Sequence, residues 1–380
     1  MERTDDRLRH LAVAEALLSL PTVPLVEDLP AAHVAAFVET RPGLSADHDA
    51  AGNVLVRYQS DEADVERPLV LVAHLDHPGF AVDDVTGDEA ALTFRGGLGL
   101  TCAVVGAPVD FFVPGRVDPV GRGELVEAAG EGGRLASARA QVVAGEAVVG
   151  GFAMWGFPGY SVDDGHIVGR VCDDLLGAAV VLSALDELSR RHPEGLAVWG
   201  LFTRAEEIGF LGTLEAIRLG TVPQTANVLS LECSKALPDA PQGGGVIVRV
   251  GDRASIFDPE LSEALAGAAQ QCAGANPGFR WQRKLMDGGT CEATAFCAAG
   301  YRASGLALPL GNYHNALDDL TAEPGVGPEH VAVDDYLAGV ALLVELACSP
   351  SLLETPVGPP PWLAERGQRA QTMLTGDRRA

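Results

Sequence analysis

Lysine is nearly absent from this chain of 380 residues, in which 27 basic residues face 52 acidic ones. Only Lys235 and Lys284 occur, and the formal net charge is −25. Such an excess of negative charge argues against a surface that binds the phosphates of nucleic acid. The chain also lacks an apolar run long enough to span a membrane. We therefore expect neither nucleic acid nor a membrane as a partner.

Neither the first residues nor the cysteines lead us to expect a secreted protein. Residues 1–9 are rich in charge and lack the apolar core of a secretory signal. The seven cysteines are an odd number and lie within apolar segments, which favours free thiols in a reducing compartment over disulfides. The sequence therefore predicts a cytoplasmic protein.

The composition and the periodicity of apolar residues indicate an α/β fold. Hydrophobic residues make up 47% of the chain and charged residues 21%, as in soluble globular proteins, and the length fits two domains. Apolar periodicity of the helical type predicts helices over residues 8–20, 31–40, 175–191, 259–272, 292–299 and 333–347. Because these alternate with apolar strand-like runs, we expect a mixed-sheet α/β/α sandwich.

Between residues 82 and 166 the helical periodicity disappears. Short β-rich runs over 103–113 and 140–149 are separated by glycine clusters, which is typical of a small β-barrel inserted into the larger domain. We predict a catalytic domain from residues 1–82 and 167–348, a barrel over 83–166 and a tail over 349–380. The Gly- and Glu-rich stretch 115–139 is expected to be an exposed loop, and the tail a surface arm with a short helix.

Two adjacent carboxylates, Glu206 and Glu207, follow the apolar run 196–202 and precede glycines. An isolated pair of this kind is usually an exposed acidic turn. Where the chain turns at a strand end, however, both side chains can reach one pocket, and burying them together costs several kcal/mol unless a cation is present. The pair therefore becomes informative if other metal ligands occur nearby.

Four further places offer such ligands. His74 and Asp76 end one predicted strand, Asp173 precedes a predicted helix, Glu232 ends another strand, and His314 follows the strand-like run 304–310. Each motif alone is weak, but sites in open α/β sheets form at the carboxyl ends of strands. A ligand set of imidazole and carboxylate without thiolate suits zinc, and also cobalt or manganese.

In their order and spacing these motifs resemble the two-metal aminopeptidases of clan MH, and most closely the glutamyl and tetrahedral aminopeptidase family. That family has His-x-Asp, a long insertion, Asp-Asp-x-x-Gly, Glu-Glu-x-Gly, an acidic residue and a late His, and all occur here in that order. The turn at residues 49–53 and the Gly-Gly-Thr at 288–290 also match. The resemblance covers roughly residues 7–348.

The resemblance implies a peptidase that removes N-terminal residues from peptides with a metal-activated bridging water. Two divalent ions, with zinc as the first choice, would be bound, and the chain would form homo-oligomers through its inserted domain. Asp173 would bridge the metals, and Glu206 would be the general acid and base. The remaining roles are His74 and Glu232 on one metal, Glu207 and His314 on the other, Asp76 orienting His74, and Asp318 as an acidic partner near His314.

Some positions depart from the family's pattern. The family usually has Asp at the position of Glu232 and after Gly-Gly-Thr, where this chain has Cys291 and Glu292, and an Arg often precedes the late His, where this chain has residues 311–313. These departures leave the substrate open. Two alternatives therefore stand beside the aminopeptidase: another metal-dependent amidohydrolase on the same scaffold, such as a deacylase or dipeptidase, and a binding protein without catalysis.

Overall fold

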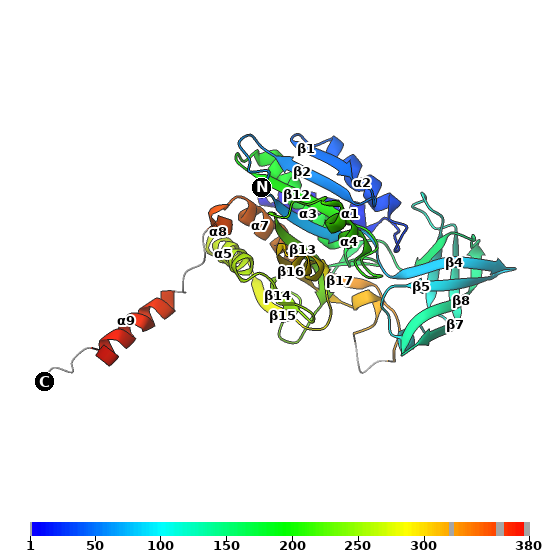
Figure 1. Ribbon diagram of the computed structural model, residues 1–380. Helices are drawn as coiled ribbons and strands as arrows, with labels where there is room; N and C mark the ends of the chain where they lie inside the picture. Colours follow the sequence, from blue (N-terminus) through cyan, green and yellow to red (C-terminus); the bar gives the residue numbers. More distant parts are fainter. Residues whose placement is uncertain (1, 319–322, 355–360, 376–380) are drawn as a thin grey trace.

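The computed structural model describes residues 2–318, 323–354 and 361–375. Its larger part is a mixed sheet of eleven strands with helices on both faces (Figure 1). The neighbours along the main path of the sheet are β1-β2-β12-β3-β13-β16-β17-β11-β10, with β14 paired to β16 and β15 to β14. The strands are β1 (Leu44–His48), β2 (Val54–Gln59), β3 (Leu69–His74), β10 (Ser161–Asp163), β11 (His166–Gly169), β12 (Ala197–Thr203), β13 (Asn227–Lys235), β14 (Val246–Asp252), β15 (Trp281–Met286), β16 (Arg302–Gly311) and β17 (Glu329–Ala332).

Four parallel strands, β12, β3, β13 and β16, form the centre of this sheet. Strand β3 is buried along its whole length, as expected for a parallel strand that is covered on both faces. Because side chains alternate along a strand, Leu69 and Leu71 belong to one hydrophobic core, and Val70 and Val72 belong to the other.

Helices cover both faces of the sheet. Helices α1, α3, α5 and α7 share the larger core, whereas residues of α4 and α6 contribute to the smaller one. The helices are α1 (Glu2–Leu18), α2 (Asp28–Glu39), α3 (Leu175–Arg191), α4 (Leu211–Leu219), α5 (Pro259–Ala275), α6 (Glu292–Ala298), α7 (Val333–Ala347), α8 (Ser351–Glu354) and α9 (Pro361–Thr375). The ranges predicted for α3 and α7 agree with the structure at both ends.

The remaining strands close into an antiparallel barrel beside the sheet (Figure 1). Its order is β4-β5-β8-β7-β6-β9, and its core contains the buried aromatic residues Phe80, Phe111 and Trp155. The strands are β4 (Gly79–Thr86), β5 (Glu89–Arg95), β6 (Pro108–Phe112), β7 (Gly121–Glu131), β8 (Arg134–Gly145) and β9 (Phe152–Trp155). The predicted fold class, an α/β/α sandwich with an inserted small β-barrel, is confirmed.

The prediction of a loop over residues 115–139 is wrong for most of its length. Strands β7 and β8 form a long hairpin there, with Gly132 and Gly133 at its turn in left-handed conformations. Its glycines and charged residues suggested a loop, but Leu125, Ala138 and other small or apolar residues alternate inward onto the barrel core. The alternation, rather than the composition, was the informative signal.

The domain boundaries stay a prediction. The barrel strands run from Gly79 to Trp155, and the strands β10 and β11 that follow pair within the large sheet. In the tail, helix α9 extends away from the rest of the chain (Figure 1), and Pro359 and Pro360 lie outside the described residues.

Within the described ranges, no helix combines the length and the hydropathy that crossing a membrane requires.

Candidate metal centre

The predicted ligands meet where the central parallel strands end. His74 is the last residue of β3, Glu206 and Glu207 lie in the loop after β12, and Glu232 lies in the second half of β13. His314 lies in a short 3-10 turn, η2 (Tyr313–Asn315), directly after β16. Asp173 lies just before α3, and its carboxylate lies beside His74 and His314. The sheet therefore brings together residues that are up to 240 positions apart, from His74 to His314.

Asp173 lies at the centre of this cluster. Its Oδ1 is 3.6 Å from Nε2 of His74, and its Oδ2 is 3.4 Å from Nε2 of His314. Oε1 of Glu207 lies 3.2 Å from the same His314 nitrogen. Two metal bonds of about 2.0–2.2 Å at a tetrahedral angle place their ligand atoms a little over 3 Å apart. These spacings therefore suit two cations, one on each oxygen of Asp173.

Three overlapping groups of side chains could each hold a cation, because their ligand atoms all lie within 4.8 Å of one another. They are His74, Asp173 and Glu232; Asp173, Glu207 and His314; and His74, Glu206 and Glu207. The first two groups are the sets that the sequence predicts for the two metals, with Asp173 shared.

The second nitrogen of each histidine is occupied by a backbone carbonyl. Nδ1 of His74 lies 3.1 Å from the carbonyl oxygen of Asp76, and Nδ1 of His314 lies 2.5 Å from that of Gly97 in the barrel. If each Nδ1 carries the proton and donates it, Nε2 is left as a free lone pair that faces the carboxylates, as in most histidine–metal sites. The barrel therefore contributes directly to the orientation of His314.

The two acidic partners predicted for the histidines differ in their contacts. Asp76 contacts His74 mainly through its carbonyl, while its carboxylate accepts the backbone N–H groups of Glu206 and Glu207 at 2.9 and 3.1 Å. Asp76 thereby fixes the loop that carries the glutamate pair. The prediction for Asp318 is wrong, since its carboxylate accepts the N–H of Asn312 and pairs with Lys235.

The electrostatics of the cluster fit a cation. Burial and the repulsion of Glu232, Glu207 and Asp76 raise the pKa of Glu206 well above its ordinary value. Burial and the neighbouring Asp173 raise the pKa of Glu232 to about 8. Among the described residues, the buried atoms Oδ1 of Asp173 and Oε1 of Glu207 have no hydrogen-bond partner. A buried carboxylate oxygen without a partner is costly, and a divalent cation would satisfy both.

A buried carboxylate that the sequence reasoning missed supports two of the ligands. Oε2 of Glu329, in β17, accepts the backbone N–H groups of Cys172 and Asp173 at 2.7 and 3.0 Å. Its Oε1 accepts the N–H of His314 at 2.8 Å. Glu329 thus joins two ligand-bearing segments that are distant in the sequence. No neighbouring motif marks it, because it stands alone in a short strand.

His77 and Asn315 extend this support. Nδ1 of His77 lies 2.5 Å from the carbonyl oxygen of Asp173, and its Nε2 lies 2.9 Å from Oδ1 of Asn315. The backbone here is also strained, since Asn312, His314 and Asn315 all have positive φ angles near +60°. Left-handed residues other than glycine cluster at functional sites when the surrounding contacts hold them in place.

The loop of the glutamate pair is held from behind by the turn at residues 49–53. Asn53 accepts the N–H of Arg204 at 3.1 Å and donates to the carbonyl of Gly212 at 2.9 Å. Gly212 packs so closely that a Cβ there would lie 2.5 Å from the backbone N and O of Arg204. This turn is therefore structural, and the space around the loop allows only glycine at position 212.

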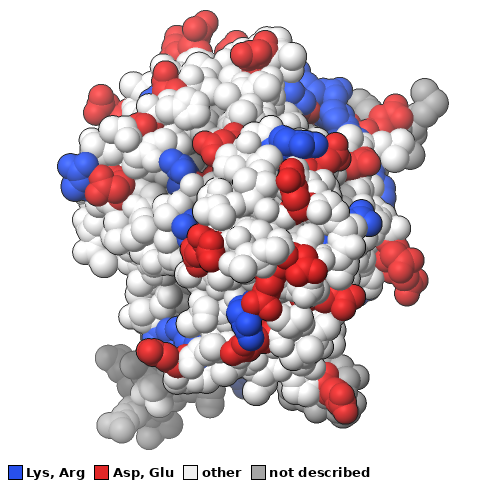
Figure 2. Space-filling model, turned by 90° about the vertical axis from the view of Figure 1, so that its right-hand side faces the viewer, with Lys and Arg blue, Asp and Glu red and all other residues white. Residues whose placement is uncertain are grey.

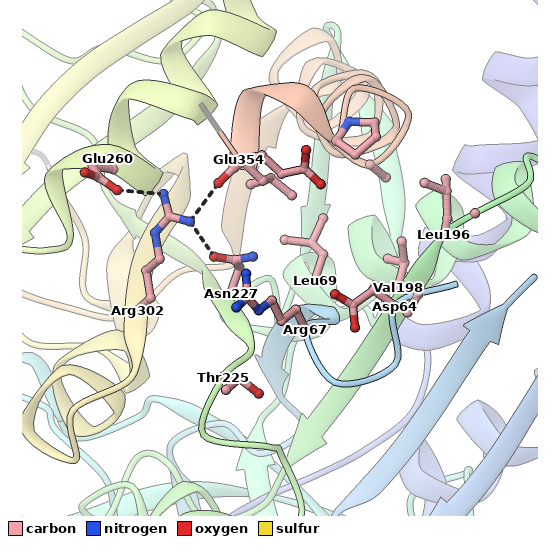
Figure 3. Close-up of a pocket in the computed structure, with 15 residues that line it drawn as sticks. Asp64, Arg67, Leu69, Leu196, Val198, Thr225, Asn227, Glu260, Arg302 and Glu354 are labelled. Atoms are coloured by element: carbon pink, nitrogen blue, oxygen red, sulfur yellow. Dashed lines mark hydrogen bonds and ion pairs between the residues drawn. The ribbon is translucent and has the colours of Figure 1, made fainter. Parts of the chain in front are cut away.

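A groove of about 650 Å³ lies at the other end of the central strands, away from the ligand cluster (Figure 3). It is lined by residues at the amino ends of the central strands, including Leu69, Val198 and Asn227. Nη1 of Arg302 donates to Oδ1 of Asn227 at 2.9 Å, and its Nη2 lies 3.4 Å from Oε2 of Glu260. Because this guanidinium is directed at protein acceptors, we assign the groove no part in the chemistry.

Comparison with known proteins agrees with this geometry. The family model described as M42 glutamyl aminopeptidase matches residues 136–322. The resemblance that the motifs predict is confirmed. A protein of Acetivibrio thermocellus named "Putative aminopeptidase" is 24% identical over 189 residues, which cover 48% of this chain and 51% of that protein. The chain thus spans about half the length of the curated relative that it matches.

Solved structures share the fold over nearly the whole chain. The TET aminopeptidase of Thaumarchaeota archaeon SCGC AB-539-E09 is 18% identical with a TM-score of 0.73, covering 91% of this chain and 98% of that one. The aminopeptidase APDkam598 of Desulfurococcus kamchatkensis is 19% identical with a TM-score of 0.72, covering 93% and 99%. The TET1 peptidase of Pyrococcus horikoshii is 18% identical with a TM-score of 0.69, covering 89% and 99%. At these identities the likeness establishes the fold alone.

Proposed function

We propose that this protein is a metal-dependent aminopeptidase that holds two divalent cations and hydrolyses the N-terminal peptide bond of peptides. The observation that carries the proposal is the shared carboxylate of Asp173, whose two oxygens each face a different histidine. We assign His74 and Glu232 to one cation and Glu207 and His314 to the other. Zinc suits these ligands best, with cobalt or manganese as alternatives.

When bound, the two cations supply positive charge to the scissile carbonyl and to the attacking water. The protein's part is to hold the substrate and to move the proton. The Glu206 carboxylate, 3.9 Å from Nε2 of His74, takes a proton from the water and returns it to the leaving amine. Its buried position supports this role, because burial raises its pKa and so makes it a better base. Asp76 keeps that loop in position through the two N–H groups it accepts.

Glu206→Gln tests this assignment. We expect the variant to keep about two metal ions per chain while its kcat falls by at least about 100-fold, as for the loss of a general base. Glu215→Gln is the matched control, because Glu215 is an exposed helical residue whose one ion pair among the described residues is with Arg218. Wild-type turnover by Glu206→Gln would remove this residue from the mechanism.

The reaction class is tested with aminoacyl amides and their N-acetylated forms, with and without added zinc or cobalt. An aminopeptidase needs the free α-amine, so acetylation should abolish cleavage. Faster cleavage of the acetylated amides would favour a deacylase, and metal binding without any hydrolysis would favour a binding protein. A protein that takes up no metal under any loading condition would contradict the proposal as a whole.

We also propose that the chain assembles into a homo-oligomer, with residues 83–166 as the inserted domain and residues 1–82 and 167–348 as the catalytic domain. One structure with this fold is described as a dodecamer, and the Pyrococcus horikoshii TET1 peptidase as a tetrahedron or a large octahedral shell. The cysteine usage of the sequence supports a cytoplasmic location. Light scattering after gel filtration would give the mass, and a monomer of 39.5 kDa would contradict the assembly.

A further inference from the structure

The tip of the barrel hairpin is fixed next to the metal centre. The N–H of Leu100 donates to the carbonyl of Gly133 at 2.9 Å, and the N–H of Leu135 donates to that of Leu98 at 2.9 Å. Arg134, between these residues, forms an antiparallel bridge with Gly99. The first residue of β8 is therefore joined by its backbone to the segment 97–100, whose Gly97 carbonyl contacts His314.

The guanidinium of Arg134 and the ring of His314 both face the space that a side chain at Gly97 would fill. A Cβ at Gly97 would lie 3.5 Å from Nη2 of Arg134 and 3.6 Å from both Cε1 and Nδ1 of His314. Because glycine has no side chain, this space stays open between the cation and the proposed metal ligand. This places a positive charge at the edge of a cluster that is otherwise rich in carboxylates.

This guanidinium has no ion pair among the residues that the structure describes, not even with its cross-strand neighbour Glu131. By contrast, Arg139 on the same strand pairs with Glu89 and Glu127. Leu135 points into the barrel core, whereas Arg134 is exposed. On the barrel side of the molecule, basic side chains are few and are scattered among acidic ones (Figure 2). An unpaired arginine presents a planar set of donors that matches a carboxylate.

We propose that Arg134 forms a carboxylate-binding subsite at the entrance of the metal centre and recognises a carboxylate of the substrate. The inference rests on the proposed peptidase function. Two sources offer the same chemistry: an acidic side chain on the first residue, and the C-terminal carboxylate of a short peptide. The residues just before His314, at positions 311–313, are uncharged. The exposed guanidinium of Arg134, which faces the same space as the His314 ring, is therefore the cation offered on this side of the site.

Two matched pairs of substrates test the subsite and separate its two sources. The first pair is Glu-p-nitroanilide against Gln-p-nitroanilide, and the second is Gln-Ala against Gln-Ala amide. In Arg134→Gln we expect kcat/KM for the charged member of one pair to fall by about 10-fold or more, as for a lost charge-assisted hydrogen bond. The neutral member should change by less than about 2-fold. Arg134→Lys keeps the charge without the planar fork. Its kcat/KM for the charged substrate should lie between that of the wild type and that of Arg134→Gln.

Arg116→Gln is the matched control, since Arg116 is an exposed arginine of the same barrel in the loop that precedes β7. It removes the same charge at the end of β7 opposite to the hairpin tip. In each substrate pair, the ratio of kcat/KM for the charged member to that for the neutral member should stay as in the wild type. Equal effects of Arg134→Gln and Arg116→Gln would overturn the proposal. An Arg134→Gln variant that treats the charged and neutral members alike, in both pairs, would also overturn it.

A binding measurement keeps the subsite independent of turnover. The aminoacyl amides and their acetylated forms decide the peptidase proposal separately. If the metal-loaded wild type cleaves none of the four substrates, calorimetric titration with glutamate, glutamine, Gln-Ala and Gln-Ala amide decides the subsite. Tighter binding of a charged ligand than of its neutral partner, with the difference lost in Arg134→Gln, supports it. Equal affinities within both pairs contradict it.

Discussion

Replacing Glu329 by glutamine should loosen one metal position more than the other. The carboxylate accepts three backbone N–H groups, two on Oε2 and one on Oε1. Glutamine has the same shape, but its NH₂ group cannot accept. The amide will orient with its oxygen toward Cys172 and Asp173, because that orientation leaves only the N–H of His314 without a partner.

The magnitude follows from that single unpaired donor. A buried N–H without a partner costs about 1–3 kcal/mol, and His314 is further strained by its positive φ of 55°. We therefore expect the affinity of the cation on Glu207 and His314 to fall by about 10- to 100-fold, the range found when groups that support metal ligands are removed. The cation on His74 and Glu232 should change far less, so a chelator should remove the two ions in two steps instead of one.

The assay is a competition between the protein and a chromophoric chelator, with metal content measured at each step. Glu215→Gln serves again as the exposed control, and the circular dichroism spectrum checks that the variant is folded. Simultaneous loss of both ions at lower chelator concentration would mean that Glu329 supports the site as a whole. A folded Glu329→Gln protein with wild-type affinity for both ions would refute the reasoning.

Two further predictions concern stability and loop geometry. Burial, followed by the repulsion of Arg9, lowers the pKa of His10 from 6.5 to about 4, so between these values the unfolded chain binds a proton that the folded protein resists. Stability is therefore retained above pH 6.5 and lost as the pH falls toward 4, by about 1 kcal/mol between pH 7 and 5 after allowance for solvent screening. Urea unfolding of wild type and His10→Gln at pH 7 and pH 5 checks this. If the variant loses as much unfolding free energy as the wild type between these pH values, His10 is not the cause of the loss. Gly212→Ala should push the backbone of Arg204 and lower kcat/KM by about 10-fold or more, whereas Gly274→Ala, in helix α5 with open space around it, should raise stability by about 0.5–1 kcal/mol and leave kinetics unchanged. Equal kinetics in the two alanine variants would mean that position 212 does not control the loop.

The sequence predicted most of the fold because its helices have a strong periodicity and its central strands are continuous apolar runs. Helices α3 and α7 were predicted with their observed ends for this reason. The hairpin of β7 and β8 was missed because its inward positions are small residues such as Ala138 and Ala140, which carry little hydrophobic signal. The alternation is present in the sequence, but small residues make it weak, and the burial of these positions depends on closure of the barrel.

Those residues of the candidate site that belong to recognisable local motifs could be predicted from the sequence. His74, Asp173 and the pair Glu206 and Glu207 each occupy a strand or helix boundary, where the residue type and its position agree. Glu329 has no such context, because its role arises from three N–H groups contributed by two distant segments. The contact of Gly97 with His314 could not be predicted either, because it is made by a backbone carbonyl, which every residue type has.

The polarity of the central strands has a practical consequence for attaching this protein to a surface. The proposed chemistry lies at one edge of the sheet, while helix α8 borders the groove at the other edge, through Leu353 and Glu354. A strand of six residues, such as β3, spans about 20 Å. An immobilising tether joined beyond α8 would therefore be separated from the metal centre by the full depth of the sheet, and a matrix attached there would leave the reactive face open to solution.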